Sequence, residues 1–196
     1  MRAEGLKITA DIYTYNASST GLTGVIPTWV QEGGHKAWIN RMKDPQVRPR
    51  LLADIREQLD EQPPEGILMV GFKTAKMSRK YLAKTVAEAA KMRGQTPEEA
   101  IVDMVIEDDN RIQCIYFSMS EDNIRKKIKL PWVSFCSDAG VYSDISKSFR
   151  THPRAFGSFI RVLGKYSRDE GLFPLEEGIR RLTHLPASNL KLDSMG

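Results

Sequence analysis

Residues 131–140 read PWVSFCSDAG, a short apolar run that stops at small and polar residues. An apolar stretch of this length, bounded by turn-forming residues, is typical of a buried strand. Asp138 comes directly after that strand, and in parallel α/β proteins the carboxyl ends of the strands form the rim of the active site. A carboxylate in this position is a candidate general base or metal ligand. The alternative is an aspartate that caps the following turn.

Strands and helices alternate along the rest of the chain. Residues 6–13 alternate apolar and polar side chains, which predicts a strand with one packed face, and residues 14–21 predict a small polar loop. Further strands are expected at residues 67–70 and 112–116. Helices are expected from Asp44 to residue 62, over 84–92, after the capping box that begins at Thr96, after Ser120, and over 155–166 and 175–183. This order favours an α/β fold over a helix bundle or a β-sandwich.

The composition is that of a globular protein. Of the 196 residues, 41% are hydrophobic and 28% are charged, which excludes collagen-like, low-complexity and broadly disordered proteins. The net charge is +4 and the charges are interspersed, so we expect no nucleic acid partner. No apolar run approaches the roughly 18 residues of a membrane span, so we expect no membrane partner. Two separate cysteines and the absence of an apolar N-terminal segment predict a cytoplasmic protein without a disulfide scaffold.

Arg154 is the second candidate site residue. It follows His152 and Pro153 at the start of the helix expected over residues 155–166. An arginine in this position can hold a substrate carboxylate in a bidentate pair. The alternative is a solvated arginine at a helix start.

Tyr13, Tyr15 and Ser19 follow the first expected strand and can line a pocket with hydroxyl groups. Tyrosines at a strand end are also common as amphipathic rim residues, so this reading has a structural alternative.

Several well-known catalytic patterns are absent from the sequence. It contains no HxH, HExxH or paired-cysteine motif, and the spacings of His35, His152 and His184 form no local metal cluster. Phosphate-loop, dinucleotide-binding and serine-hydrolase motifs are absent as well.

Four segments resemble the N-acyl-D-amino-acid deacylases. Residues 10–22, ADIYTYNASSTGL, resemble the family pattern D-x-Y-P-Y-x-A-s-x-T-x-L, and residues 136–139, CSDA, resemble its G-S-D-G/A strand end. Residues 152–168, HPRAFGSFIRVLGKYSR, are similar to H-P-R-x-x-G-x-F-x-R-V-L-G-x-Y-x-R-E. Residues 175–187, LEEGIRRLTHLPA, are similar to L-E-E-A-I-R-R-M-T-x-L-P-A. Thr14 stands where the pattern has a proline, which is expected to loosen that turn.

The resemblance implies a zinc-dependent amidohydrolase on a (β/α)8 TIM-type barrel that hydrolyses the amide bond of N-acyl-D-amino acids. Asp138 would then be the aspartate of the last barrel strand. It would take a proton from the metal-bound water, pass it to the leaving amine, and contribute to the metal site. Arg154 would bind the substrate α-carboxylate, and Tyr13 and Ser19 would line the pocket.

The family's remaining metal ligands would fall before residue 1. The resemblance therefore implies that residues 1–196 are the C-terminal portion of a barrel, with its last two strands, an inserted α/β subdomain at about 23–129, and closing helices. We expect such a chain to be inactive alone, to keep no zinc, and to self-associate or bind a missing N-terminal barrel portion. Two alternatives stay open: a non-catalytic carboxylate-binding module, and the structural half of a split barrel.

Overall fold

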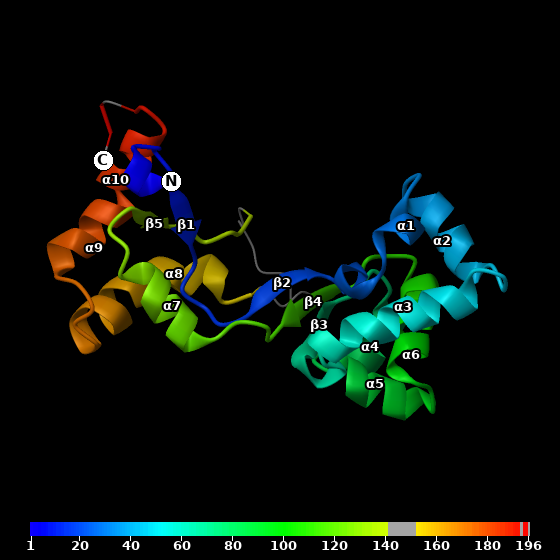
Figure 1. Cartoon of the computed structure of the whole chain (residues 1–196). Helices are drawn as coiled ribbons and strands as arrows, with labels where there is room; N and C mark the ends of the chain where they lie inside the picture. The colour runs from blue at the N-terminus through cyan, green and yellow to red at the C-terminus, as the bar shows by residue number, and fades with distance from the viewer. Residues whose placement is uncertain (141–151, 193, 196) are drawn as a thin grey trace. The chain divides into compact units, whose positions relative to one another are not determined.

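The computed structural model describes residues 1–140, 152–192, 194 and 195 (Figure 1). Its contacts divide the chain into two compact units, which are described separately. Unit 1 consists of residues 1–16, 119–140 and the described residues from 152 onward, and unit 2 consists of residues 17–118. Both contain helices and short strands, so the chain is a mixed α/β protein. Within the described ranges, no helix is long and apolar enough to cross a membrane.

Unit 2 is built on a three-stranded antiparallel sheet with the strand order β2 (Ser18–Gly21), β4 (Gln113–Tyr116), β3 (Ile67–Gly71). The central strand β4 buries Cys114 and Tyr116 and leaves its other two side chains half-buried. This period of two is expected for a strand with one face against a core. The helices of this unit are α1 (Thr28–Gln31), α2 (His35–Lys43), α3 (Arg48–Glu61), α4 (Ala75–Tyr81), α5 (Val86–Arg93) and α6 (Pro97–Asp108).

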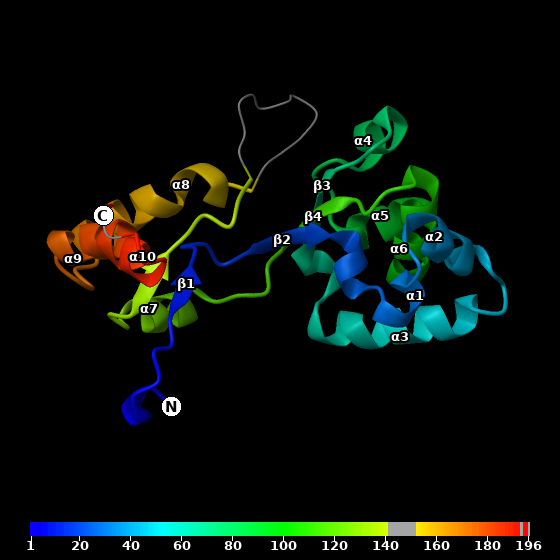
Figure 2. The same ribbon diagram turned by 90° about the horizontal axis from the view of Figure 1, so that it is seen from above.

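The core of unit 2 forms where its helices present apolar stripes. Leu51, Ile55 and Leu59 of α3 are buried at intervals of four residues, and Ile101 and Met104 of α6 are fully buried. Helices α5 and α6 lie against each other (Figure 2), and each begins with a capping box. These boxes satisfy backbone N–H groups that the first helical turn leaves without partners.

Unit 1 is built on a parallel pair of strands, β1 (Ala10–Ile12) and β5 (Val133–Phe135), in which Ala10 lies opposite Val133 and Ile12 opposite Phe135. Helix α7 (Glu121–Ile128) precedes β5. Helix α8 (Arg154–Arg161) continues into a π-helical segment, Val162–Asp169, and is followed by α9 (Leu175–Leu182) and α10 (His184–Asn189). A small apolar core joins them, formed by Ile124, Ile128, Phe135, Val162, Tyr166 and Phe173.

Most of the predicted elements are confirmed, with boundary shifts of a few residues. The capping box at Thr96 and the N-cap at Ser120 stand where the sequence predicts them. The predicted loop over 14–21 is partly wrong, because its second half forms β2 by pairing with β4. The helix expected from Asp44 begins at Arg48 instead.

Candidate functional site

The candidate site lies at the carboxyl ends of β1 and β5. Because β1 and β5 are parallel, their carboxyl ends lie at the same edge of the sheet. Tyr13 follows β1 directly, and Asp138 follows β5 after two residues. This is the edge at which open and closed parallel sheets place their binding residues.

Arg154 joins these two strand ends. It is the first residue of α8, and its side chain is only 10% exposed. One guanidinium nitrogen, Nη2, lies 3.0 Å from Oδ2 of Asp138. The guanidinium carbon lies 4.7 Å from the centre of the Tyr13 ring, which is a cation–π distance. Of the four residues to which the deacylase resemblance gives a role, Arg154 therefore contacts two, Asp138 and Tyr13.

Asp138 differs from Arg154 in its exposure. Its side chain is 61% exposed, although its partner is buried. Its backbone has a φ of +48°, in the left-handed region that residues other than glycine adopt rarely. Such conformations often occur at functional sites, where the surrounding structure stabilises them. The carboxylate is thus accessible to a small molecule while still facing a fixed cation.

The pKa values of Tyr13 and Cys136 are both raised above their ordinary values. Burial raises the pKa of the Tyr13 phenol, and the nearby Arg154 guanidinium opposes that rise without cancelling it. Burial also raises the pKa of the Cys136 thiol. At neutral pH the Tyr13 hydroxyl is therefore a hydrogen-bond donor, and Cys136 is a thiol rather than a nucleophilic thiolate.

His152 is a site residue that the sequence reasoning did not assign. It is 6% exposed, and its Nδ1 accepts a hydrogen bond from the backbone N–H of Arg154 at 3.0 Å. Its ring meets the Tyr15 ring edge-on at 5.5 Å and the Tyr13 ring at 6.4 Å. The signal for it was the position of His152 two residues before Arg154, where a side-chain acceptor can fix the start of α8.

The comparisons with known proteins point to one family. The D-aminoacylase of Alcaligenes xylosoxydans xylosoxydans is 38% identical over 82 residues, which are 42% of this chain and 16% of that protein. The N-acyl-D-glutamate deacylase of Bordetella bronchiseptica, solved with zinc and a phosphonate mimic of the tetrahedral intermediate, superimposes with a TM-score of 0.66 at 25% identity. It matches 98% of this chain and 31% of its own. The chain is similar to the N-acyl-D-amino-acid deacylases in part of its sequence and in its fold.

A solved D-aminoacylase, studied for its binuclear metal centre, is also similar, with a TM-score of 0.64, 25% identity, and coverage of 97% of this chain and 30% of its own. The chain thus spans about a third of the solved deacylases that it matches. No family model matches the chain.

Ser19, the fourth predicted residue, belongs to unit 2. Its hydroxyl donates a hydrogen bond to the Cys114 carbonyl and accepts one from the Gln113 side chain, at 3.1 and 3.2 Å. Both contacts tie β2 to β4. The pocket role that the deacylase pattern implies for Ser19 stays a prediction.

The described part of the chain does not supply a deacylase metal centre by itself. Among those residues, no group of three or more His, Cys, Asp or Glu side chains is placed to hold a metal ion. The Asp138 carboxylate pairs with Arg154 instead. Structural and catalytic zinc sites take at least three protein ligands, so these residues alone do not fit a zinc ion.

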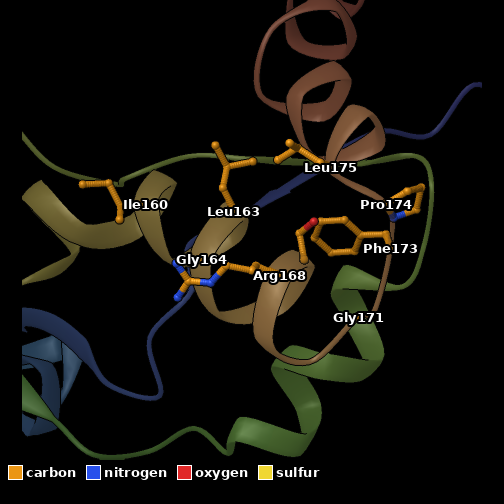
Figure 3. A pocket seen from close by; sticks show the side chains of 9 residues that line it. Ile160, Leu163, Gly164, Arg168, Gly171, Phe173, Pro174 and Leu175 are labelled. Carbon is orange, nitrogen blue, oxygen red and sulfur yellow. The ribbon is translucent and has the colours of Figure 1, made fainter.

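A hollow of about 800 Å³ in unit 1 is separate from the candidate site (Figure 3). Its lining is largely apolar and comes from α8, the π-helical segment, the link after it and the start of α9, including Leu163, Phe173 and Leu175 (Figure 3). It includes neither Asp138 nor Arg154.

Proposed function

We propose that the chain is the C-terminal portion of a deacylase that hydrolyses the amide bond of N-acyl-D-amino acids. In this proposal, β1 and β5 are the last two strands of a (β/α)8 barrel, and residues of about 23–129 form an insertion between them. Two observations support the arrangement. The strands β1 and β5 pair in parallel, and the residues between them in the sequence include a compact unit over residues 17–118. The family similarity supplies the reaction class.

One observation carries the proposal: Arg154 is buried against the Tyr13 ring and presents its guanidinium to a carboxylate at the strand ends. A buried guanidinium needs a carboxylate or other hydrogen-bond acceptors as partners, because desolvation of an unpaired charge is costly. The carboxylate of Asp138 fills that role here. An N-acyl amino acid carries a second carboxylate, and the planar guanidinium can bind it through two parallel N–H groups.

The proposed roles follow from exposure and charge. Arg154 binds the α-carboxylate of the substrate, and the hydroxyl of Tyr13 lies beside it as a donor. Asp138, the exposed carboxylate, accepts the proton of the attacking water and returns it to the amine nitrogen as the carbon–nitrogen bond breaks. We propose that Asp138 also contributes to the zinc site of the complete enzyme. The other ligands would come from a further part of that enzyme, and we expect this chain alone to keep no zinc.

Binding can be tested on the chain as it exists. We expect calorimetry to detect binding of N-acetyl-D-methionine to the wild-type chain, and at least about tenfold weaker binding to Arg154→Ala, because one charge-assisted bidentate pair is lost. Arg168→Ala is the matched control, since Arg168 is an exposed arginine of the same unit that pairs with Asp169. Equal affinity in wild type and Arg154→Ala would contradict the proposed role.

Catalysis needs the complete enzyme. We expect the purified chain to release no D-methionine from N-acetyl-D-methionine, with or without zinc. Once it is combined with the rest of a deacylase barrel, we expect Asp138→Asn to lower turnover more than a hundredfold, because removing a general base has an effect of about this size. Activity within tenfold of wild type would remove Asp138 from this role. Zinc-dependent release by the chain alone would overturn the expectation that it is inactive.

A non-catalytic carboxylate-binding module is the second candidate function. The same observation favours it, since the Arg154–Tyr13 arrangement needs no metal to hold a carboxylate. The DNA upstream of the Met1 codon separates the candidates. An in-frame continuation with an HxH motif favours a longer enzyme, and a separate gene for the rest of a barrel favours a split enzyme. If neither is present, the binding module is the better description.

A further inference from the structure

Thr14 stands between Tyr13 and Tyr15 and holds this tyrosine segment, residues 13–15, against α8. This side chain is fully buried, although the sequence places it in a polar turn. Its hydroxyl donates a hydrogen bond to the carbonyl of Ser158 at 3.0 Å. A buried hydroxyl has a net cost unless it finds such a partner. The contact joins residues that are 144 positions apart in the chain.

The backbone of Thr14 is held as well as its side chain. Its carbonyl accepts a hydrogen bond from Nε of Arg161 at 2.8 Å. The guanidinium carbon of the same arginine lies 4.6 Å from the centre of the Tyr15 ring. A Cβ at Gly157 would collide with the Tyr15 hydroxyl, so glycine is required where this ring meets α8. The Thr14 hydroxyl, the Thr14 carbonyl and the Tyr15 ring thus each contact α8.

The same face of α8 carries Arg154. The residues that meet the segment, Ser158 and Arg161, follow Arg154 by four and seven positions and therefore share its face of the helix. The Ser158 hydroxyl donates to the carbonyl of Arg154 at 2.8 Å. Ser158 therefore makes two separate hydrogen bonds, one through its backbone carbonyl to Thr14 and one through its hydroxyl to the backbone of Arg154.

We infer that Thr14 is a positioning residue whose hydroxyl fixes the tyrosine segment on α8 and so sets the Tyr13 ring against the guanidinium of Arg154. It acts through Tyr13 and Arg154 and touches no substrate. The family pattern has a proline here, which carries neither a hydroxyl nor an N–H donor. The threonine does not loosen the turn in this chain, because a buried hydrogen bond holds it. The inference rests on the proposed function only for the identity of the ligand.

Three variants test the role of the hydroxyl. Thr14→Val keeps the shape and removes the hydroxyl, Thr14→Ser keeps the hydroxyl, and Thr183→Val is the matched control. The Thr183 hydroxyl also donates to a backbone carbonyl at 3.0 Å, but it does so on α9. We expect Thr14→Val to weaken binding of N-acetyl-D-methionine about tenfold, as expected for a lost buried hydrogen bond. Thr14→Ser should stay within about threefold of wild type, and Thr183→Val should leave binding unchanged.

A second measurement separates positioning from stability. Hydrogen exchange at the Nε–H group of Arg154, followed by NMR and assigned by its loss in Arg154→Lys, reports how firmly the guanidinium is held. We expect faster exchange in Thr14→Val and wild-type exchange in Thr14→Ser. Ile124→Val, a change in the buried core of unit 1, should lower the unfolding midpoint without changing this exchange. If Thr14 had only a structural role, Thr14→Val and Thr14→Ser would both lower the unfolding midpoint without changing exchange at Arg154, as Ile124→Val does.

The outcomes distinguish this inference from the proposed function. If the wild-type chain does not bind N-acetyl-D-methionine, the proposed ligand is wrong, and exchange at Arg154 still decides the role of Thr14. If Thr14→Val exchanges at the wild-type rate, or Thr14→Ser fails to restore the wild-type rate, the inference is overturned.

Discussion

The two units differ in the proportion of apolar and polar side chains that they bury. Unit 2 encloses a large apolar core, which includes fully buried Ile55, Ile101 and Met104. Unit 1 has a small apolar core and buries polar groups beside it, among them Arg154 and Arg181.

Helix α8 shows the difference most clearly. Its buried residues are Arg154 and Ser158, whereas Phe156 and Ile160 are 54% and 73% exposed. A surface helix ordinarily turns its apolar stripe toward the core. The contrast teaches that unit 2 is stabilised mainly by apolar burial, whereas unit 1 has a smaller apolar core and also holds buried polar groups near its strand ends.

The largest expected effect is in the core of unit 2. Ile101→Ala removes fully buried methyl and methylene groups from α6 and leaves a cavity. We expect it to lower the free energy of unfolding by about 2–5 kcal/mol, measured by urea denaturation. Ile160→Ala is the matched change in unit 1, and we expect it to stay within about 0.5 kcal/mol because that side chain is mostly exposed. Equal effects of the two substitutions would break the comparison.

Arg181 tests whether a buried charge stabilises unit 1. Its Nε donates to the carbonyl of Val133 at 2.7 Å, and its Nη1 donates to that of Ile128 at 2.6 Å. Its guanidinium carbon also lies 4.5 Å from the centre of the Phe135 ring. We expect Arg181→Ala to lower the free energy of unfolding by about 3 kcal/mol, because two buried carbonyls lose charged donors.

The neighbouring arginine is the control for that prediction. Arg180 is 38% exposed and pairs with Glu177 at 2.7 Å. An exposed ion pair contributes little, so we expect Arg180→Ala to cost less than about 1 kcal/mol in the same urea experiment. If the two alanine variants were equally stable, the buried guanidinium would not be the group that holds β5 and α7 together.

Features that depend on neighbouring residues could be predicted from the sequence. The capping box at Thr96 and the N-cap at Ser120 are satisfied within three residues of each cap. Asp138 and Arg154 could also be predicted as site residues, because one follows an apolar strand and both fall in family motifs. Their contact through a 3.0 Å ion pair agrees with that expectation of a common location, while their roles stay predictions.

Features that depend on distant pairing could not be predicted. Residues 18–21 are small and polar, and they form β2 only because β4 pairs with them, more than 90 residues later. The burial of Thr14 likewise depends on Ser158. The helix expected over residues 155–166 is present in part as α8, but the exposure of its apolar residues Phe156 and Ile160 could not be predicted, because periodicity says nothing about which face is covered.

The smallest expected effect is a pH-dependent one on the surface of unit 2. Asp109 lies 2.7 Å from Nζ of Lys73 and 2.8 Å from Nε2 of His35, and these partners lower the pKa of its carboxyl to about 2. Because the pKa is lower in the folded chain, the contribution to stability is present above the ordinary value of 3.8 and is lost as the pH falls toward 2. We expect Asp109→Asn to have a lower unfolding midpoint than wild type at pH 6, with the difference vanishing at pH 2.

Lys73→Gln is the matched variant for this surface pair, since Lys73 is the larger cause of the shift. Removal of the Lys73 ammonium group should return the pKa of Asp109 toward 3.8. NMR titration of the carboxyl measures this change. Both partners are about half exposed, so the difference in midpoint should be small beside that of Ile101→Ala. A midpoint difference at pH 2 as large as that at pH 6 would mean that the charge of Asp109 is not its source.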